Sequence, residues 1–347
     1  MIFLECDYNN GAHSKVMEAL LCANTQNHAT YGYDVHSQNA QQIIRDLCQK
    51  QDLQAYFLAG GTQVNRTFIR SCLRVYEGVL STKEGHIATH ETGAIESDGH
   101  KVLCVPGGQG AMAGKVDMQS LQTFLQGELY DPANEHVVKP GMLYISQPTE
   151  TGTMYSEQEL KNLRALCDAH GLLLYCDGAR LASAIAHYGK SMWQTLAQTC
   201  DAFYIGGTKC GALFGEALVI CNPALNQGLK HVIKQSGALM AKGYVIAAQF
   251  EALLQNDLYQ EIGAHNNALA KQIAIALQNK GYELTAINDS NQVFAILPQA
   301  HIAVLSEHCK CMPIAKLPNQ MQEVRFVTSH QNTQAEIDTL LQVIAQL

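Results

Sequence analysis

The chain has 347 residues, of which 47% are hydrophobic and 16% charged, a composition that is typical of globular proteins and excludes a disordered chain. The 31 acidic residues outnumber 23 scattered basic ones, which excludes the basic surface of a nucleic-acid-binding protein. No apolar run approaches the roughly 18 residues of a membrane helix, and the start lacks an export signal. We therefore expect a soluble, cytoplasmic protein whose 12 cysteines are reduced core residues.

The length is a little more than twice the roughly 150 residues of a typical domain, so we expect two packed units. Short apolar runs alternate with helical patterns, which predicts βα units and a mostly parallel seven-stranded sheet. One predicted helix runs from Ser156 to His170, begins with a capping box of Ser156 and Glu159, and ends at Gly171. The expected strands are Ala55 to Leu58, Gly78 to Ser81, Lys101 to Val105, Met142 to Ser146, Leu172 to Cys176, Ala202 to Ile205 and Ala217 to Cys221.

The pattern changes after Pro223, where long helices come first and strands follow. This order predicts a smaller C-terminal α+β domain. We expect a large α/β domain over residues 15–240 and a small domain over 241–347 that includes residues 1–14. The predicted elements are helices from Ala224 to Leu254, with a break near Gly237, and from Asp257 to Asn279, then strands Glu283 to Ile287, Gln292 to Leu297 and Glu323 to Thr328.

Polar residues that directly follow strands are candidates for chemistry, because a parallel sheet binds ligands at the carboxyl ends of its strands. Gly60-Gly61-Thr62-Gln63 lies between a strand and a helical run, where free N–H groups can hold a phosphate. The same residues also fit an ordinary tight turn with a threonine cap. Asp177 ends another strand and fits either a catalytic carboxylate or a helix cap.

Lys209 follows a third strand through two glycines. A lysine near apolar groups can have a lowered pKa, which leaves a neutral amine able to form a Schiff base. The combination of a phosphate turn, an acid and a lysine at three strand ends fits pyridoxal phosphate. The lysine binds the aldehyde, the helix terminus binds the phosphate, and the acid keeps the pyridine nitrogen protonated.

Several motifs of the sequence, taken in their order along the chain, resemble those of a known enzyme family. The chain resembles the β-eliminating lyase and threonine aldolase family of fold-type I pyridoxal-phosphate enzymes, in particular its low-specificity threonine aldolase-like members. The resemblance implies a PLP-dependent transferase-like fold and a homodimer or homotetramer with active sites at subunit interfaces. The motifs that carry it are Asp7-Tyr8-Asn9-Asn10-Gly11, Tyr31-Gly32, Gly60-Gly61-Thr62-Gln63, Gly85-His86, Asp177-Gly178-Ala179-Arg180, Gly206-Gly207-Thr208-Lys209 and Val324-Arg325.

The resemblance implies a role for each matching residue. Lys209 matches the Schiff-base lysine and Asp177 the partner of the pyridine nitrogen. His86 matches a histidine that stacks on the cofactor ring and is also a candidate acid or base. The other implied cofactor contacts are Gly60, Gly61, Thr62, Gln63, Thr149, Arg180 and Thr208.

The resemblance also implies residues that bind the substrate. Arg325 matches an arginine that holds the α-carboxylate of an amino acid, a task for which the guanidinium fork is suited. Arg180 lies beside either the cofactor's phenolic oxygen or that carboxylate. Residues that approach from a neighbouring subunit are Tyr31, Lys234 and Lys242. We expect no metal, because Cys309 and Cys311 lack the partners of a four-ligand site.

The expected reaction is cleavage of a β-hydroxy-α-amino acid, such as L-threonine, allo-threonine or a bulkier analogue, to glycine and an aldehyde. Two departures put the substrate in question. Pro148 stands where threonine aldolases carry a histidine, and proline cannot remove the β-hydroxyl proton, so His86, His90 or water must serve. A substrate-binding serine is also missing around Cys6 to Asn10. The alternative is β-elimination of a serine- or cysteine-like amino acid to pyruvate and ammonia, with Lys209 as the base.

Overall fold

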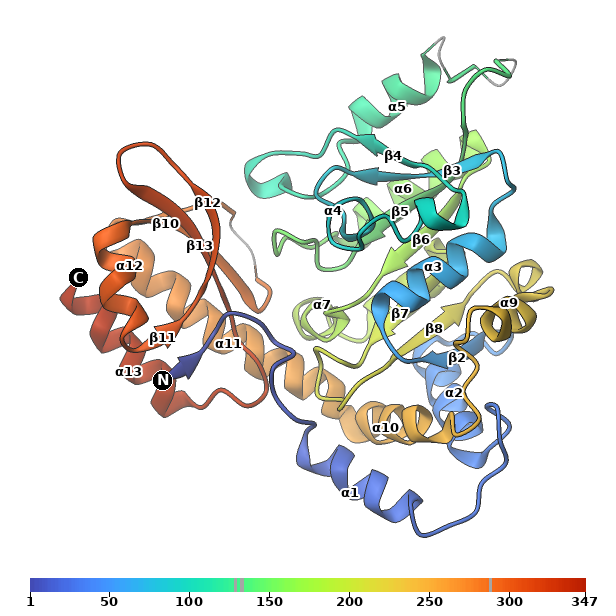
Figure 1. Ribbon diagram of the computed structural model, residues 1–347, viewed down its shortest axis with the longest axis horizontal. Coiled ribbons are helices and arrows are strands. Elements are labelled where there is room, and N and C mark those ends of the chain that lie inside the picture. Colours follow the sequence, from blue (N-terminus) through green and yellow to red (C-terminus); the bar gives the residue numbers. More distant parts are fainter. Residues whose placement is uncertain (128–129, 132–133, 287–288) are drawn as a thin grey trace.

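The computed structural model describes residues 1–127, 130–131, 134–286 and 289–347. The chain forms two lobes that lie side by side (Figure 1). The larger lobe holds a seven-stranded sheet, and the smaller lobe contains the C-terminal elements together with the first residues of the chain.

The large sheet has the strand order β2-β8-β7-β6-β5-β3-β4. All of its strands are parallel except β8, which is antiparallel to both of its neighbours. The expected fold class is therefore confirmed, and every predicted strand of this sheet is present. Their bounds are β2 Gln54–Leu58, β3 Glu77–Thr82, β4 Val102–Val105, β5 Lys139–Ser146, β6 Leu173–Asp177, β7 Ala202–Gly206 and β8 Glu216–Ile220.

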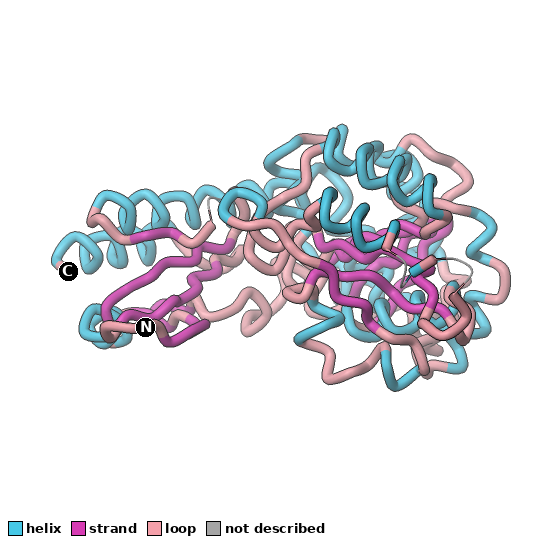
Figure 2. The backbone as a smooth tube through the Cα atoms, turned by 90° about the horizontal axis from the view of Figure 1, so that it is seen from above, coloured by secondary structure: helices cyan, strands magenta, loops and turns pink. Residues whose placement is uncertain are grey.

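Helices cover both faces of this sheet (Figure 2). One face packs against Ile44, Leu160, Leu196 and Phe250 from α2, α6, α8 and α10, and the other against Phe68 from α3. Because both faces are buried, the middle parts of the strands are mostly apolar. The predicted capping box of Ser156 and Glu159 at the start of α6 is present, and so is the predicted end of this helix at Gly171. The helix bounds are α1 Ser14–Ala23, α2 Val35–Cys48, α3 Gly61–Cys72, α4 His86–Thr89, α5 Met118–Gln126, α6 Glu157–His170, α7 Leu181–Tyr188, α8 Ser191–Thr199, α9 Leu229–Gln235 and α10 Tyr244–Leu254.

The small lobe contains a four-stranded antiparallel sheet of order β12-β13-β10-β9. Its core includes Ile2 and Leu4 from the start of the chain, and β1 pairs with β11. The long helix α11 joins the lobes, because Ile262 packs in the large core and Ile273 in the small one. The bounds are β1 Ile2–Phe3, α11 Leu258–Asn279, β9 Glu283–Leu284, β10 Gln292–Pro298, α12 Gln299–Ser306, β11 Cys309–Lys310, β12 Met312–Lys316, β13 Met321–Val327 and α13 Gln334–Gln346.

Several expectations about this region differ from the structure. The stretch 224–254 was predicted as helix with one break, but it forms a short 3-10 turn, α9 and α10, because Gly228 and Gly237 both have positive φ. The strand predicted from 283 is short, and its last residue, Ile287, lies outside the described residues. Strand β12 and helix α12 were not predicted. The proposed division at residue 240 stays a prediction.

The cysteines are all unpaired. Seven are buried, as expected, but Cys22 and Cys104 are exposed, so the expectation of a core position is wrong for these two. Within the described ranges, none of the helices has the length and apolar character needed to cross a membrane.

Candidate active site

A cavity of about 340 Å³ lies at the carboxyl ends of the strands of the large sheet. Strands β2, β5, β6 and β7 end there and deliver the residues that follow them, as expected for a parallel sheet. The predicted site residues that line this cavity are Gly60, Gly61, Thr62, His86, Thr149, Asp177, Arg180, Thr208 and Lys209.

Asp177 is the last residue of β6 and is buried. Its Oδ2 accepts hydrogen bonds from the Tyr144 hydroxyl at 2.6 Å and from Asn65 Nδ2 at 3.1 Å, while Oδ1 accepts the Ala179 N–H at 3.0 Å. No cationic side chain forms an ion pair with Asp177 among the residues that the structure describes. A buried carboxylate with only neutral donors fits a site that receives a cationic group.

Lys209 reaches the cavity from the turn after β7. Burial lowers the pKa of its amine, and Arg180 lowers it further, although Asp7, Asp177 and Glu216 act in the opposite direction. Its Nζ lies 5.6 Å from the centre of the Tyr8 ring. The lowered pKa makes the neutral, nucleophilic amine more accessible than in a solvated lysine.

His86 begins the short helix α4 and is fixed by two carboxylates. Its Nδ1 lies 2.8 Å from Oε1 of Glu91, and its backbone N–H donates to Oε1 of Glu150 at 2.8 Å. Asn65 Nδ2 also donates to Glu91 at 2.8 Å, which links this histidine to Asp177. Burial opposes protonation, but Glu91 and Asp177 outweigh it and raise the pKa of His86.

The glycine turn before α3 has no side-chain cap. The first N–H groups of the helix therefore lack a side-chain acceptor, as in an anion-binding terminus. A Cβ on Gly61 would lie 3.0 Å from the Tyr204 hydroxyl, so the residue needs to be small. Gln63 does not line the cavity, because its Oε1 accepts the Ala59 N–H at 3.0 Å.

Of the two predicted arginines, Arg180 lines the cavity, whereas Arg325, on β13 of the small lobe, does not. Arg180 forms a bidentate pair with Asp7 at 2.7 and 3.0 Å. Arg325, on β13, contacts the Glu5 carbonyl at 3.3 Å and Gln292 at 3.4 Å, and its Nε is buried without a partner. Burial lowers the pKa of Arg325, and nearby Arg180 adds to this effect. An unsatisfied guanidinium donor fits a site for a carboxylate.

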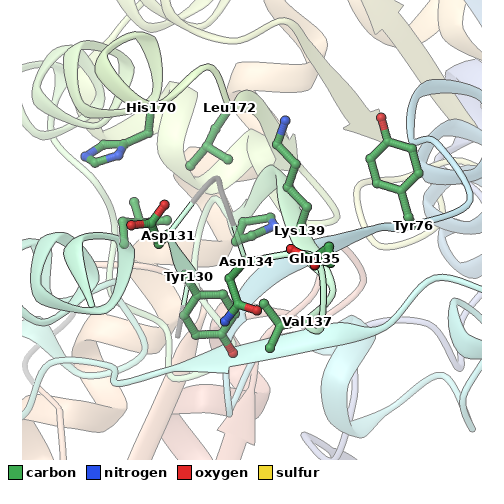
Figure 3. A pocket seen from close by; sticks show the side chains of 11 residues that line it. Tyr76, Tyr130, Asp131, Asn134, Glu135, Val137, Lys139, His170 and Leu172 are labelled. Carbon is green, nitrogen blue, oxygen red and sulfur yellow. The ribbon is translucent and has the colours of Figure 1, made fainter. Parts of the chain in front are cut away.

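The residues predicted to approach from a neighbouring subunit do not line this cavity. Lys234 Nζ lies 4.6 Å from the centre of the Tyr31 ring, and Lys242 is exposed. Another pocket, lined by Tyr76, Tyr130 and Lys139 among others (Figure 3), lies at the amino ends of β3 and β5. The amino ends of the strands are opposite the carboxyl ends, where the candidate site lies.

Sequence reasoning missed several residues of the site. The cavity is also lined by Glu150 and Glu216. Tyr144 donates a hydrogen bond to Asp177, and Asn65 donates to both Asp177 and Glu91. Tyr144 has the pattern of an ordinary core strand residue, and Asn65 lies inside a helix. The carboxyl groups of Glu150 and Glu216, next to strand ends, were the only indication that the sequence offered.

Comparisons with known proteins agree with this geometry. The model of the β-eliminating lyase family matches residues 6–300. The low specificity L-threonine aldolase of Pseudomonas aeruginosa is 29% identical over 306 residues, which cover 86% of this chain and 85% of that protein. The Saccharomyces cerevisiae low specificity L-threonine aldolase is 28% identical and covers 83% of this chain and 72% of its own.

Two solved structures are also similar to this chain. The Leishmania major threonine aldolase structure superposes with a TM-score of 0.95 at 38% identity and covers 100% of this chain and 99% of its own. SPT with PLP as an internal aldimine shares the fold, with a TM-score of 0.71 at 15% identity over 99% of this chain and 86% of its own. The extent of the family match and the Leishmania likeness show that this chain belongs to the β-eliminating lyase family.

Proposed function

We propose that the protein is a pyridoxal-phosphate-dependent aldehyde lyase that cleaves a β-hydroxy-α-amino acid such as L-threonine to glycine and an aldehyde. The observation that carries this proposal is the meeting of Lys209, Asp177 and His86 in one cavity at the strand ends. The threonine aldolases among its relatives support the substrate class.

The described residues fit pyridoxal phosphate. The buried carboxylate of Asp177 has no cationic partner of its own within the described ranges and suits a protonated ring nitrogen. The uncapped start of α3 suits a phosphate, and Lys209 offers an amine with a lowered pKa. When bound, this cofactor accepts the electron pair left on the substrate's α-carbon as a bond to that carbon breaks.

We propose a separate role for each of three residues of the chain. Lys209 would hold the cofactor through its amine. Asp177 keeps a proton on the ring nitrogen, since a carboxylate favours a nearby cation. Arg325, whose Nε is buried without a partner, is the residue that we propose to bind the substrate carboxylate.

His86 is the residue that we propose as the base for the β-hydroxyl proton. Its Nδ1 faces the Glu91 carboxylate, so this nitrogen carries the hydrogen and Nε2 is left to accept the proton. Pro148 lines the cavity but has no group that can accept one. The raised pKa of His86 makes it a stronger base than a free imidazole once it is neutral.

The test is to supply pyridoxal phosphate to the purified protein and to record both visible absorption and aldehyde release from L-threonine. After unbound cofactor is removed, we expect the absorption of the lysine-linked cofactor and the release of aldehyde in the natural protein and neither in Lys209→Ala. Lys190→Ala is the matched control, because Lys190 is exposed and pairs with Asp257 far from the cavity. A protein that binds the cofactor but releases no aldehyde from any β-hydroxy-amino acid would contradict the proposal.

The second candidate function is β-elimination of a serine-like amino acid to pyruvate and ammonia. The presence of Pro148 in the cavity lining favours it, because in elimination Lys209 itself removes the α-proton and no base for the hydroxyl is needed. Pyruvate from L-serine without aldehyde from L-threonine would establish this alternative.

We further propose that the protein forms a homodimer or homotetramer. Helix α1 exposes Met17 and Leu21, and the segment that follows exposes Tyr33 and Val35. Exposed apolar side chains that gather on one part of a chain are typical of subunit interfaces. Analytical ultracentrifugation tests this, and a monomer at micromolar concentration would contradict it.

A further inference from the structure

Glu216 is a buried carboxyl group in the candidate site that the reaction steps above do not use. It begins β8, is 5% exposed, and lines the same cavity as Lys209. The sheet register places it opposite Gly206 on β7 and opposite Leu58 on β2. It therefore lies between the strand that leads to the lysine and the strand that leads to the phosphate turn.

One oxygen of Glu216 holds the turn that carries the lysine. Its Oε2 accepts the N–H of Gly207 at 2.8 Å, and this N–H also donates to the Gly215 carbonyl at the longer distance of 3.1 Å. The rest of this turn is closed on itself, because Thr208 N–H donates to the Gly215 carbonyl at 3.1 Å and Gly215 N–H donates to the Thr208 hydroxyl at 3.0 Å. The turn is tight, since a Cβ on Gly207 would lie 2.5 Å from the Gly215 oxygen. A carboxylate at its base thus fixes the position from which Lys209 extends.

The charges of this carboxyl group and of the lysine also act on each other. Burial raises the pKa of Glu216 to about 7, while hydrogen bonds from Thr208 and Gly207 and the charge of Lys209 act to lower it. In return, the charge of Glu216 raises the pKa of Lys209. The titratable groups that face Glu216 are Lys209, Asp177, Tyr204, Cys210 and Tyr259.

We propose that Glu216 is a positioning residue for Lys209: it anchors the 206–209 turn through the Gly207 N–H and places a second carboxyl group in the cavity that holds the lysine nitrogen, where its charge favours the protonated lysine. This inference rests on the proposed function, because it concerns the lysine that holds the cofactor. It assigns two separable tasks to one carboxyl group, anchoring and charge.

Three substitutions separate these tasks. Glu216→Gln keeps an oxygen that can accept from Gly207 but removes the charge. Glu216→Asp keeps the charge but is one methylene too short to reach the Gly207 N–H, and Glu216→Ala removes both. Glu323→Gln is the matched control, because Glu323 is a partly buried glutamate on β13 that accepts a hydrogen bond from Thr285 away from the cavity.

The experiment records the visible absorption of the pyridoxal-phosphate-loaded protein against pH, and the rate at which the cofactor is lost on dilution. In Glu216→Gln we expect the midpoint of the absorption change to move about one pH unit lower, because removal of an anion disfavours the protonated lysine nitrogen. In Glu216→Asp the midpoint should stay, but the cofactor should leave about tenfold faster. Glu216→Ala should show both effects, and Glu323→Gln neither.

The inference is overturned if Glu216→Gln titrates like the natural protein, or if Glu216→Asp shifts the midpoint as Glu216→Gln does. Circular dichroism and thermal unfolding of each variant show whether the fold is retained. Failure of the proposed function has a different signature, because the natural protein itself would then retain no pyridoxal phosphate after gel filtration, or would retain it and release no aldehyde from any β-hydroxy-amino acid.

Discussion

Asp7 and Arg180 lie 173 positions apart in the chain and form two parallel hydrogen bonds of 2.7 and 3.0 Å. The pair joins the N-terminal segment to the end of β6, at the border of the candidate site. Asn291 also donates to Asp7, at 2.9 Å. The same contact thus connects the large lobe, the first residues and the small lobe.

Asp7→Asn should destabilise the protein by about 3–5 kcal/mol, because it leaves the buried Arg180 without its counter-charge. Urea unfolding at neutral pH measures the change. The control is Asp98→Asn, which breaks an equally bidentate pair with the more exposed Arg66 and should cost only about 0–1 kcal/mol. Equal losses in the two variants would contradict the role of burial.

The Asp7 pair should also make stability depend on pH. Burial opposes ionisation of Asp7, but Arg180 and Lys209 outweigh it and lower its pKa. A lowered pKa in the folded state means that the stabilisation is present above the unfolded value of about 4 and is lost as the pH falls through the folded value. Unfolding curves recorded at decreasing pH should therefore converge for the natural protein and Asp7→Asn.

Asp177→Asn should reduce kcat for amino-acid cleavage by about 100-fold or more, since a neutral amide does not hold a proton on the cofactor's ring nitrogen. The fold should persist, because the amide oxygen can still accept from Tyr144 and Asn65. Steady-state kinetics with saturating cofactor measures the effect.

Tyr144→Phe is the matched control for Asp177. It removes one hydrogen bond to the carboxylate but leaves the charge, so the loss should be about tenfold or less. A larger loss in Tyr144→Phe than in Asp177→Asn would mean that the tyrosine, and not the charge of the acid, dominates the site.

The sequence predicted the large sheet well because its strands are buried on both faces and are therefore apolar runs between glycines and helices. It failed for β12, whose residues Met312 and Ile314 are exposed at the edge of the small sheet, so burial leaves no pattern there. Prediction of α12 failed similarly, since only Leu305 of its residues is buried.

For the site, the sequence indicated residues that directly follow strands, such as Lys209 and Asp177, because that position alone brings them to the ligand edge. The supporting contacts are not encoded locally. Asn65 reaches Asp177 from 112 positions away, and its place inside a helix gives no indication of that role. The roles assigned to these residues remain predictions.

Arg325→Lys should raise KM for the amino acid by about tenfold and change kcat little, because a lysine offers one point charge in place of the guanidinium fork. The control is the same substitution at Arg70, which contacts Gln235 on the exposed surface of α3. A fall in kcat at constant KM for Arg325→Lys would place this arginine outside the carboxylate site.

Glu91→Gln should move the acid limb of the pH profile of kcat/KM to lower pH. In the folded protein burial lowers the pKa of His86, but the Glu91 hydrogen bond and the charges of Asp177 and Glu91 raise it overall. His86 accepts a proton only when it is neutral, so activity rises with pH through that raised pKa. Loss of the Glu91 charge lowers the pKa and extends activity toward acid.

The absolute rate of Glu91→Gln should also fall, since the glutamine holds the His86 ring less firmly than a carboxylate does. The matched control is Glu77→Gln, because Glu77 accepts the Arg74 N–H at the amino end of β3, away from the cavity, and should leave the profile in place. An acid limb that stays fixed in Glu91→Gln while kcat falls would show that a group other than His86 titrates there. His90, whose ring stacks 5.5 Å from that of His86, would then be the residue to substitute next.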